Sequence, residues 1–99
     1  KFAYGGIGVV IHARAKIGNN CIIGQGITIG GKSKIYDVPV IGNKVFISSG
    51  VRILGDIKIG SNVIIGANSV VVKNIESNNM VAGVPAKVIR TNIMFDNYV

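Results

Sequence analysis

The sequence has little cysteine, few aromatic residues, few acidic residues and no long apolar run. Cys21 is the only cysteine among 99 residues, so an internal disulfide is excluded and a reducing compartment is favoured. No apolar stretch of membrane-spanning length is free of charge and glycine, and no signal-peptide pattern is present. These absences predict a cytoplasmic protein without a membrane partner.

The charge of the chain is strongly one-sided. Eleven lysines and arginines face four acidic residues, which gives a formal net charge of +7. The basic residues are scattered, and the three tyrosines and three phenylalanines do not alternate with them as a stacking platform for bases requires. We therefore expect no nucleic acid partner. Scattered charge is typical of a solvated surface, and a polyanionic ligand is the alternative.

A six-residue repeat runs without a break from residue 11 to residue 76. An aliphatic residue starts every unit: Ile11, Ile17, Ile23, Ile29, Ile35, Ile41, Ile47, Ile53, Ile59, Ile65 and Val71. Glycine often follows, and the fifth position is small or β-branched, as Cys21 is in its unit. Such a unit is a short strand and a turn, and a short strict period is typical of solenoids. We predict an all-β parallel β-helix whose core is a column of stacked isoleucines.

Two segments depart from the repeat. Residues 32–40 keep the phase but lose the Gly-Asn chemistry, and Pro39 cannot donate to a ladder, so a projecting loop is expected there. After residue 76 we predict a turn at 77–79, an extended run at 80–90, and a short helix or disorder at 91–99. The predicted organisation is one domain over 1–99, with the repeat at 5–76 and a terminal segment at 77–99. Because the chain starts with Lys1 and not Met, it is alternatively the C-terminal part of a longer protein.

Several motifs resemble those of the hexapeptide-repeat acyltransferases. They are Ile41-Gly42-Asn43-Lys44-Val45-Phe46, Ile59-Gly60-Ser61-Asn62-Val63-Ile64, and the ending Ile65–Val71 followed by Ala82–Ile89. The segment Gln25–Gly31 is most similar to serine acetyltransferases and polysaccharide O-acetyltransferases. The resemblance implies a left-handed helix, a homotrimer, and acetyl-CoA bound between neighbouring prisms. It further implies transfer of the acetyl group to a small hydroxyl acceptor, either L-serine or a sugar.

The resemblance also implies positions that contact the cofactor: Gly30, Gly31, Lys32, Ser49, Ala67, Lys73 and Arg90. Ser49 and Ala67 match small residues beside the pantetheine arm. Residues 30–32 match a loop near the nucleotide, and Lys73 and Arg90 match basic residues near the phosphates. The alternative for the two basic residues is ordinary surface charge. No metal site is predicted.

At the position of the catalytic base the chain departs from the family pattern. In serine acetyltransferase-like chains it lies about seven residues before His12, where this chain has Tyr4 or Gly5, and the second family histidine corresponds to Val38. His12 is the only histidine, and we predict that it is the base that activates the acceptor hydroxyl. The alternatives are a surface role for His12, and a non-catalytic trimeric domain or truncated homologue that lacks the catalytic histidine.

Two other interpretations are rejected. Gly26–Ser33 matches the phosphate-loop pattern G-x-x-x-x-G-K-S, but its middle residues keep the strand register of the repeat and no helix is expected after it. A structural β-helix of the antifreeze type would not need the polar loop or the segment Ala82–Ile89.

Overall fold

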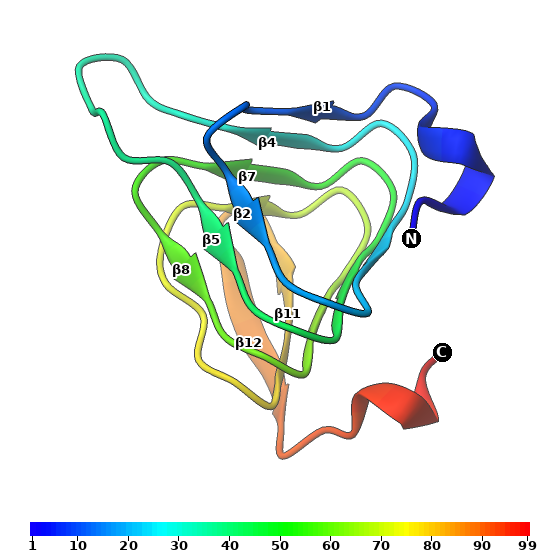
Figure 1. Ribbon diagram of the computed structural model, residues 1–99. Helices are drawn as coiled ribbons and strands as arrows, with labels where there is room; N and C mark the ends of the chain where they lie inside the picture. Colours follow the sequence, from blue (N-terminus) through cyan, green and yellow to red (C-terminus); the bar gives the residue numbers. More distant parts are fainter.

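The computed structural model describes residues 1–99 as a three-sided stack of short strands (Figure 1). The first sheet contains β1 (Val10–Ile11), β4 (Thr28–Gly30), β7 (Arg52–Leu54) and β10 (Val70–Val71). The second contains β2 (Lys16–Ile17), β5 (Val40–Ile41) and β8 (Lys58–Ile59). The third contains β3 (Ile22–Ile23), β6 (Val45–Ile47), β9 (Val63–Ile65), β11 (Asn79–Gly83) and β12 (Ala86–Thr91). The 3-10 helices η1 (Ala3–Gly6) and η2 (Phe95–Asn97) lie at the two termini.

The chain winds as a left-handed parallel β-helix. In Figure 1 it runs counterclockwise while it recedes from the viewer, which defines a left-handed turn. Strand pairs that stack directly, such as Val10 with Thr28, lie eighteen residues apart, which is three units. The predicted fold class is confirmed, and it departs from the right-handed rule that governs most parallel crossovers.

The core is the predicted aliphatic column. The starting residues of the units from Ile23 onward are buried with one exception, and the fifth-position residues from Cys21 to Ile75 are buried except Ser33, which lies in the projecting loop. The exception is Ile35, which is 45% exposed, so its assignment to the column was wrong. Thr28 pairs with Arg52, twenty-four residues away, because the loop inserts six residues between β4 and β5. An insertion of one repeat length preserves the phase although Ile35 lies in the projecting loop (Figure 1).

Three corners join the sheets, and each is a tower of stacked turns. Each corner is named by the two sheets that it joins, in chain order. The third–first corner comprises residues 24–27, 48–51 and 66–69, and the first–second corner comprises 12–15, 31–39, 55–57 and 72–74. The second–third corner comprises 18–21, 42–44, 60–62 and 76–78. In the last tower the Asn43 Oδ1 accepts from the main-chain N–H of Asn19 at 2.7 Å, and the Ser61 Oγ accepts from that of Asn43 at 3.0 Å. Asn20 and Asn62 there have positive φ, which asparagine tolerates. The Gly-Asn chemistry of the repeat therefore serves the corners.

The terminal segment forms a hairpin and a tail. Strands β11 and β12 pair in antiparallel fashion around the cis Val84–Pro85 bond, which confirms the extended run. The tail then returns along the second–third corner and ends in η2, so the short-helix alternative is the correct one. Ile93 and Phe95 are buried, and the Asn62 side chain donates to the Ile93 carbonyl at 2.8 Å and accepts from the Phe95 N–H at 2.5 Å.

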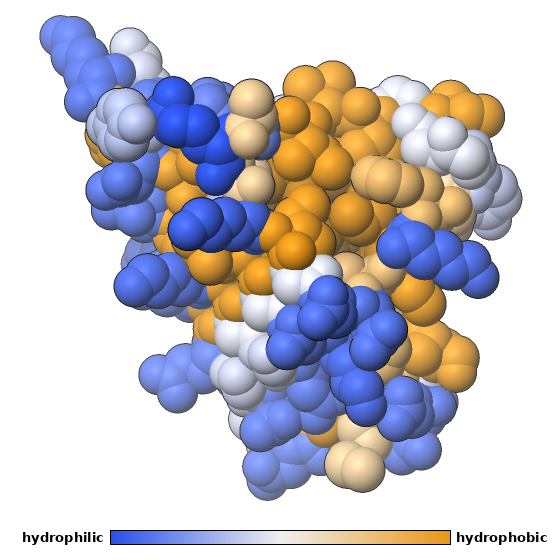
Figure 2. All heavy atoms as spheres, in the orientation of Figure 1, coloured by the Kyte–Doolittle hydropathy of each residue, from blue (hydrophilic) through white to orange (hydrophobic).

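The end of the stack that faces the viewer in Figure 2 is apolar at its centre. Val9, Ile11, Ala15 and Ile17 of the first turn are only partly buried where they pack on the core. No helix of the structure has the length and apolarity needed to span a lipid bilayer.

Candidate active site

A shallow groove of about 360 Å³ runs along the third–first corner. Its lining residues come from η1, from β6 and from the stacked turns: Ala3, Tyr4, Gly24, Phe46, Ser48, Ser49 and Ala67. Ser49 and Ala67, the two positions predicted to contact pantetheine, therefore lie together, on successive turns of the helix.

The floor of this groove is packed tightly because its turns stack main chain on main chain. The Ser49 carbonyl accepts from the Asn68 N–H, and the Gln25 carbonyl accepts from the Gly50 N–H, both at 2.9 Å. A Cβ added at Gly24 would lie 2.9 Å from the Ser49 nitrogen, a distance that real Cβ atoms essentially never show. Gly24 is thus required for the close approach that sets the spacing of the turns.

The Arg52 side chain links successive turns of the same corner by hydrogen bonds. Its Nη1 donates to the carbonyl of Gly26 at 2.6 Å and to that of Gly50 at 3.1 Å, so one guanidinium joins two successive turns. Both glycines have positive φ, which turns their carbonyls toward a shared donor. Arg52 follows the floor residue Ser49 by three positions and stabilises the backbone on which Ser49 lies.

The side walls of the groove are aromatic. Phe46 points outward from β6 and is half-buried, while Tyr4 projects from η1 and is 70% exposed. The backbone of Tyr4 is left-handed, with φ 55° and ψ 28°, a conformation that bulky residues rarely adopt. Two rings beside a main-chain floor fit a slender, mostly apolar chain with a few amide groups.

A second set of predicted positions gathers at the first–second corner, across the first sheet. Register places Gly30 beside Leu54, and Gly31, Lys32 and Lys73 occupy the same tower of turns. The aliphatic stem of Lys32 lies against Gly55, where an added Cβ would be 3.2 Å from it. Gly55 follows Ser49 by six positions, so the two lie at most roughly 20 Å apart at ~3.3 Å per extended residue. One prism therefore presents the predicted cofactor positions on two different corners.

His12 starts this second tower, directly above Gly30, and lines none of the grooves of the structure. Its main-chain N–H donates to the Ile29 carbonyl at 2.7 Å, and its Nδ1 accepts from the Arg14 N–H at 3.1 Å. A neutral imidazole whose Nδ1 accepts carries its proton on Nε2. In this arrangement the exposed nitrogen of His12 is a donor. Its assignment as the base stays a prediction.

The projecting loop is held down at its far end. The Arg14 guanidinium lies 4.1 Å from the centroid of the Tyr36 ring and donates to the Tyr36 carbonyl at 2.5 Å. Val38, which stands where the second family histidine was expected, is buried. It offers no polar group to a substrate, and it anchors the return of the loop to β5.

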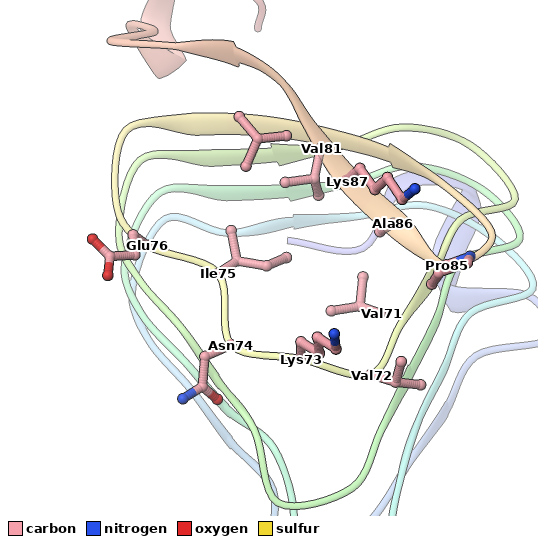
Figure 3. A pocket seen from close by; sticks show the side chains of 11 residues that line it. Val71, Val72, Lys73, Asn74, Ile75, Glu76, Val81, Pro85, Ala86 and Lys87 are labelled. Carbon is pink, nitrogen blue, oxygen red and sulfur yellow. The ribbon is translucent and has the colours of Figure 1, made fainter.

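A cavity of about 190 Å³ lies at the C-terminal end of the stack, between the last turn and the hairpin (Figure 3). Its floor is the end of the core column, with Val71 and Ile75, and Lys73 and Lys87 are among its lining residues. Neither lysine has an ion-pair partner, since the only ion pair of the structure joins Lys44 to Asp96. Two unpaired lysines and one carboxylate, that of Glu76, therefore line this mainly apolar cavity.

Arg90 lies apart from both corners that carry the other predicted positions. It pairs with Met80 near the start of β11, whereas Lys87 pairs with Ala82, next to the third–first corner. The structure thus brings Lys87, and not Arg90, toward the groove. Lys87 lies inside the terminal signature and could have been considered from the sequence. Phe46 ends a repeat motif at a position that carries no functional signal, Tyr4 was considered only as a replacement for the base, and both were missed as groove residues.

The remaining reactive groups are inert or dispersed. Cys21 is buried, and its Sγ lies 3.3 Å from the Gly42 carbonyl, as expected of a core residue. No three residues of the metal-binding types lie close enough to hold an ion.

Comparison with known proteins places these features in a family. Residues 39–73 match the family model "bacterial transferase hexapeptide (six repeats)". A search of curated proteins found no significant match.

Solved structures resemble most of the chain. Neisseria gonorrhoeae serine acetyltransferase in complex with serine is 43% identical, with a TM-score of 0.81 over 87% of this chain and 35% of that one. The Brucella abortus strain S19 serine acetyltransferase in complex with coenzyme A is 37% identical, with a TM-score of 0.85 over 90% of this chain and 36% of that one. A hexapeptide-repeat acetyltransferase of Vibrio cholerae, complexed with acetyl coenzyme A, is 25% identical, with a TM-score of 0.74 over 85% of this chain and 54% of that one.

This chain spans little more than a third of the two serine acetyltransferases. The unbroken six-residue period, the three-sided stack and these matches agree, and the chain belongs to the hexapeptide-repeat transferases.

Proposed function

We propose that the protein is an acetyl-CoA-dependent O-acetyltransferase that acts on a small hydroxyl acceptor, either L-serine or a sugar. The observation that carries this proposal is the groove in which Ser49 and Ala67 lie on successive turns, between Phe46 and Tyr4. In this proposal main-chain groups on these turns pair with the amides of a pantetheine arm, and the aromatic walls cover its methylene groups. Related structures hold coenzyme A or acetyl-CoA, which supports the same co-substrate.

The proposed active form is a homotrimer. Ser49 and Ala67 lie on one corner of the prism, and Gly30, Gly31 and Lys32 lie on another. A cofactor that touches both sets is best held between two prisms, where a corner of one copy faces a corner of its neighbour. The unpaired cysteine fits a cytoplasmic location.

In this proposal the phosphates of the cofactor meet basic side chains at the C-terminal end of the stack. Lys73 and Lys87 make no ion pair and lie beside the hairpin that ends the third–first corner. Glu76 lines the same cavity, but neither ammonium group pairs with it, so both can take a phosphate as their counter-ion. Arg90 is less well placed to meet the phosphates than Lys87, because it lies at the other end of β12.

His12 remains the proposed general base, supplied from the neighbouring copy. To accept a proton through Nε2, its imidazole must release the Arg14 N–H and carry its own proton on Nδ1. A substitution of His12 by Asn should then lower kcat by about 10²–10⁴-fold. The present hydrogen bond of His12 favours the second candidate, a non-catalytic trimeric domain.

Release of free thiol from acetyl-CoA tests the proposal. Purified protein should release thiol when serine or a sugar is added, and acceptors without a hydroxyl group should give no release. A chain that binds coenzyme A but releases no thiol with any hydroxyl acceptor would contradict the enzyme and support the non-catalytic domain.

A further inference from the structure

The groove contains a polar group, the phenol of Tyr4, that has no role in the fold and none in the chemistry proposed above. Tyr4 is the only titratable residue that lines it, and its ring stands across from the floor made by Ser49 and Ala67. Tyr4 or Gly5 also occupies the position where the base of related chains is expected. The chain thus lacks a histidine at this position and has a phenol at it or next to it.

The backbone at this position is unusual and local. Tyr4 and the adjacent Gly5 both have left-handed φ, at 55° and 67°, so the segment turns sharply before the first strand. A bulky residue in that region marks a position that the surrounding structure over-determines, and such positions cluster at functional sites. The contacts of η1 with β3 place this turn against the stack. The turn holds the phenol at the groove.

We propose that the Tyr4 hydroxyl donates a hydrogen bond to the carbonyl oxygen of the bound thioester as the acceptor adds to it. This inference rests on the acetyltransferase function proposed above. A phenol O–H is a good donor, and a donor aimed at a developing oxyanion stabilises the transition state more than the ground state. Tyr4 is then a catalytic residue that replaces part of the missing histidine without acting as a base.

The reaction balances without any proton transfer to or from the phenol. The acceptor oxygen forms a bond to the thioester carbon, the carbonyl electron pair moves to the oxygen that Tyr4 contacts, and the acceptor proton passes to the base. The adduct then collapses, the carbon–sulfur bond breaks, and the thiolate takes a proton to give free coenzyme A. Tyr4 keeps its proton throughout, so the phenol does not need to ionise at neutral pH.

Substitution of Tyr4 by Phe tests the inference, since it removes the hydroxyl and keeps the ring. We expect kcat to fall by at least about tenfold, and by up to 10²–10³-fold, as for the loss of one oxyanion donor. The Kd for coenzyme A, measured by calorimetry, should stay within about twofold. Tyr4→Ala should lower kcat and also weaken coenzyme A binding, because the aromatic wall is lost.

The matched control is Tyr98→Phe in the tail, whose hydroxyl makes no hydrogen bond in the structure and which lies outside the groove. It should leave kcat and Kd unchanged. An unchanged kcat in Tyr4→Phe would overturn the role of Tyr4 and leave the proposed function standing. If Ser48→Ala then lowers kcat, the oxyanion donor is Ser48 instead. A wild-type protein that binds coenzyme A but transfers no acetyl group would overturn the proposed function together with this role.

Discussion

The main-chain nitrogen of Ser49 lies 2.9 Å from the point where a Cβ on Gly24 would be. This contact joins two successive turns of the helix at the floor of the groove, and it leaves no room for a side chain. Gly24 thus shapes the floor of the groove although it has no side chain.

Gly24→Ala should therefore disturb both stability and binding. The added methyl group must push the 48–51 turn away, which should lower the free energy of unfolding by about 1–3 kcal/mol. It should also weaken coenzyme A binding several-fold by moving Ser49. Urea unfolding and calorimetry measure the two effects. Gly42→Ala is the control, because its Cβ would crowd Ser61 Oγ at 2.7 Å on the second–third corner. It should lose comparable stability and, where folded, bind coenzyme A normally.

Arg52→Ala should loosen the same corner without adding bulk. Two carbonyls lose their charged donor, so we expect a loss of about 1–2 kcal/mol in unfolding free energy and weaker coenzyme A binding. Arg52→Lys, which keeps one donor, should recover part of the binding. If Arg52→Ala binds coenzyme A as tightly as the wild type, the guanidinium does not position the floor of the groove.

Lys73→Ala and Lys87→Ala should each weaken coenzyme A binding by roughly three- to tenfold, because each removes a cation near the proposed phosphate position. Both variants should also reduce the salt dependence of the Kd. Dephospho-coenzyme A, which lacks one phosphate, should respond less to the substitutions. Lys34→Ala, at the exposed turn of the loop, is the control and should bind like the wild type. Equal salt slopes in all four proteins would place the phosphates elsewhere.

Phe95→Ala should release the tail from the second–third corner. The Phe95 side chain is 6% exposed, so its truncation should lower the free energy of unfolding by about 2–4 kcal/mol. It should also abolish the protection of the Ile93 amide against hydrogen exchange, since this amide donates to the Asn78 carbonyl. Hydrogen exchange and urea unfolding report the two quantities. The neighbouring Met94 is 61% exposed, and Met94→Ala should change the stability by no more than about 0.5 kcal/mol. Retained Ile93 protection in Phe95→Ala would show that the polar contacts of the tail, with Asn62 and Lys44, hold it without the Phe95 ring.

The sequence predicted the core because every unit carries its own inward residue. Stacking of identical units makes one position inward in all of them, which is why Ile29 and Ile53 were identified correctly. The same rule misplaced Ile35, since an insertion of one repeat length is invisible in the phase. The loop around it was still detected from Pro39 and from the change in composition.

The groove could be predicted only in part. Ser49 and Ala67 belong to a motif, so their positions followed from the resemblance, and the eighteen-residue turn brings them together. No motif assigns Tyr4 or Phe46 a function, and their place in the groove depends on how η1 folds back onto the third sheet. The division of the predicted cofactor positions between two corners could not be foreseen either, because it depends on where each turn lies around the prism.

A crystal structure with coenzyme A tests the central claim most directly. We predict density for the pantetheine arm along Gly24, Ser49 and Ala67, between the rings of Tyr4 and Phe46, with the phosphates toward Lys73 and Lys87. Coenzyme A bound elsewhere, with this groove empty, would contradict the account.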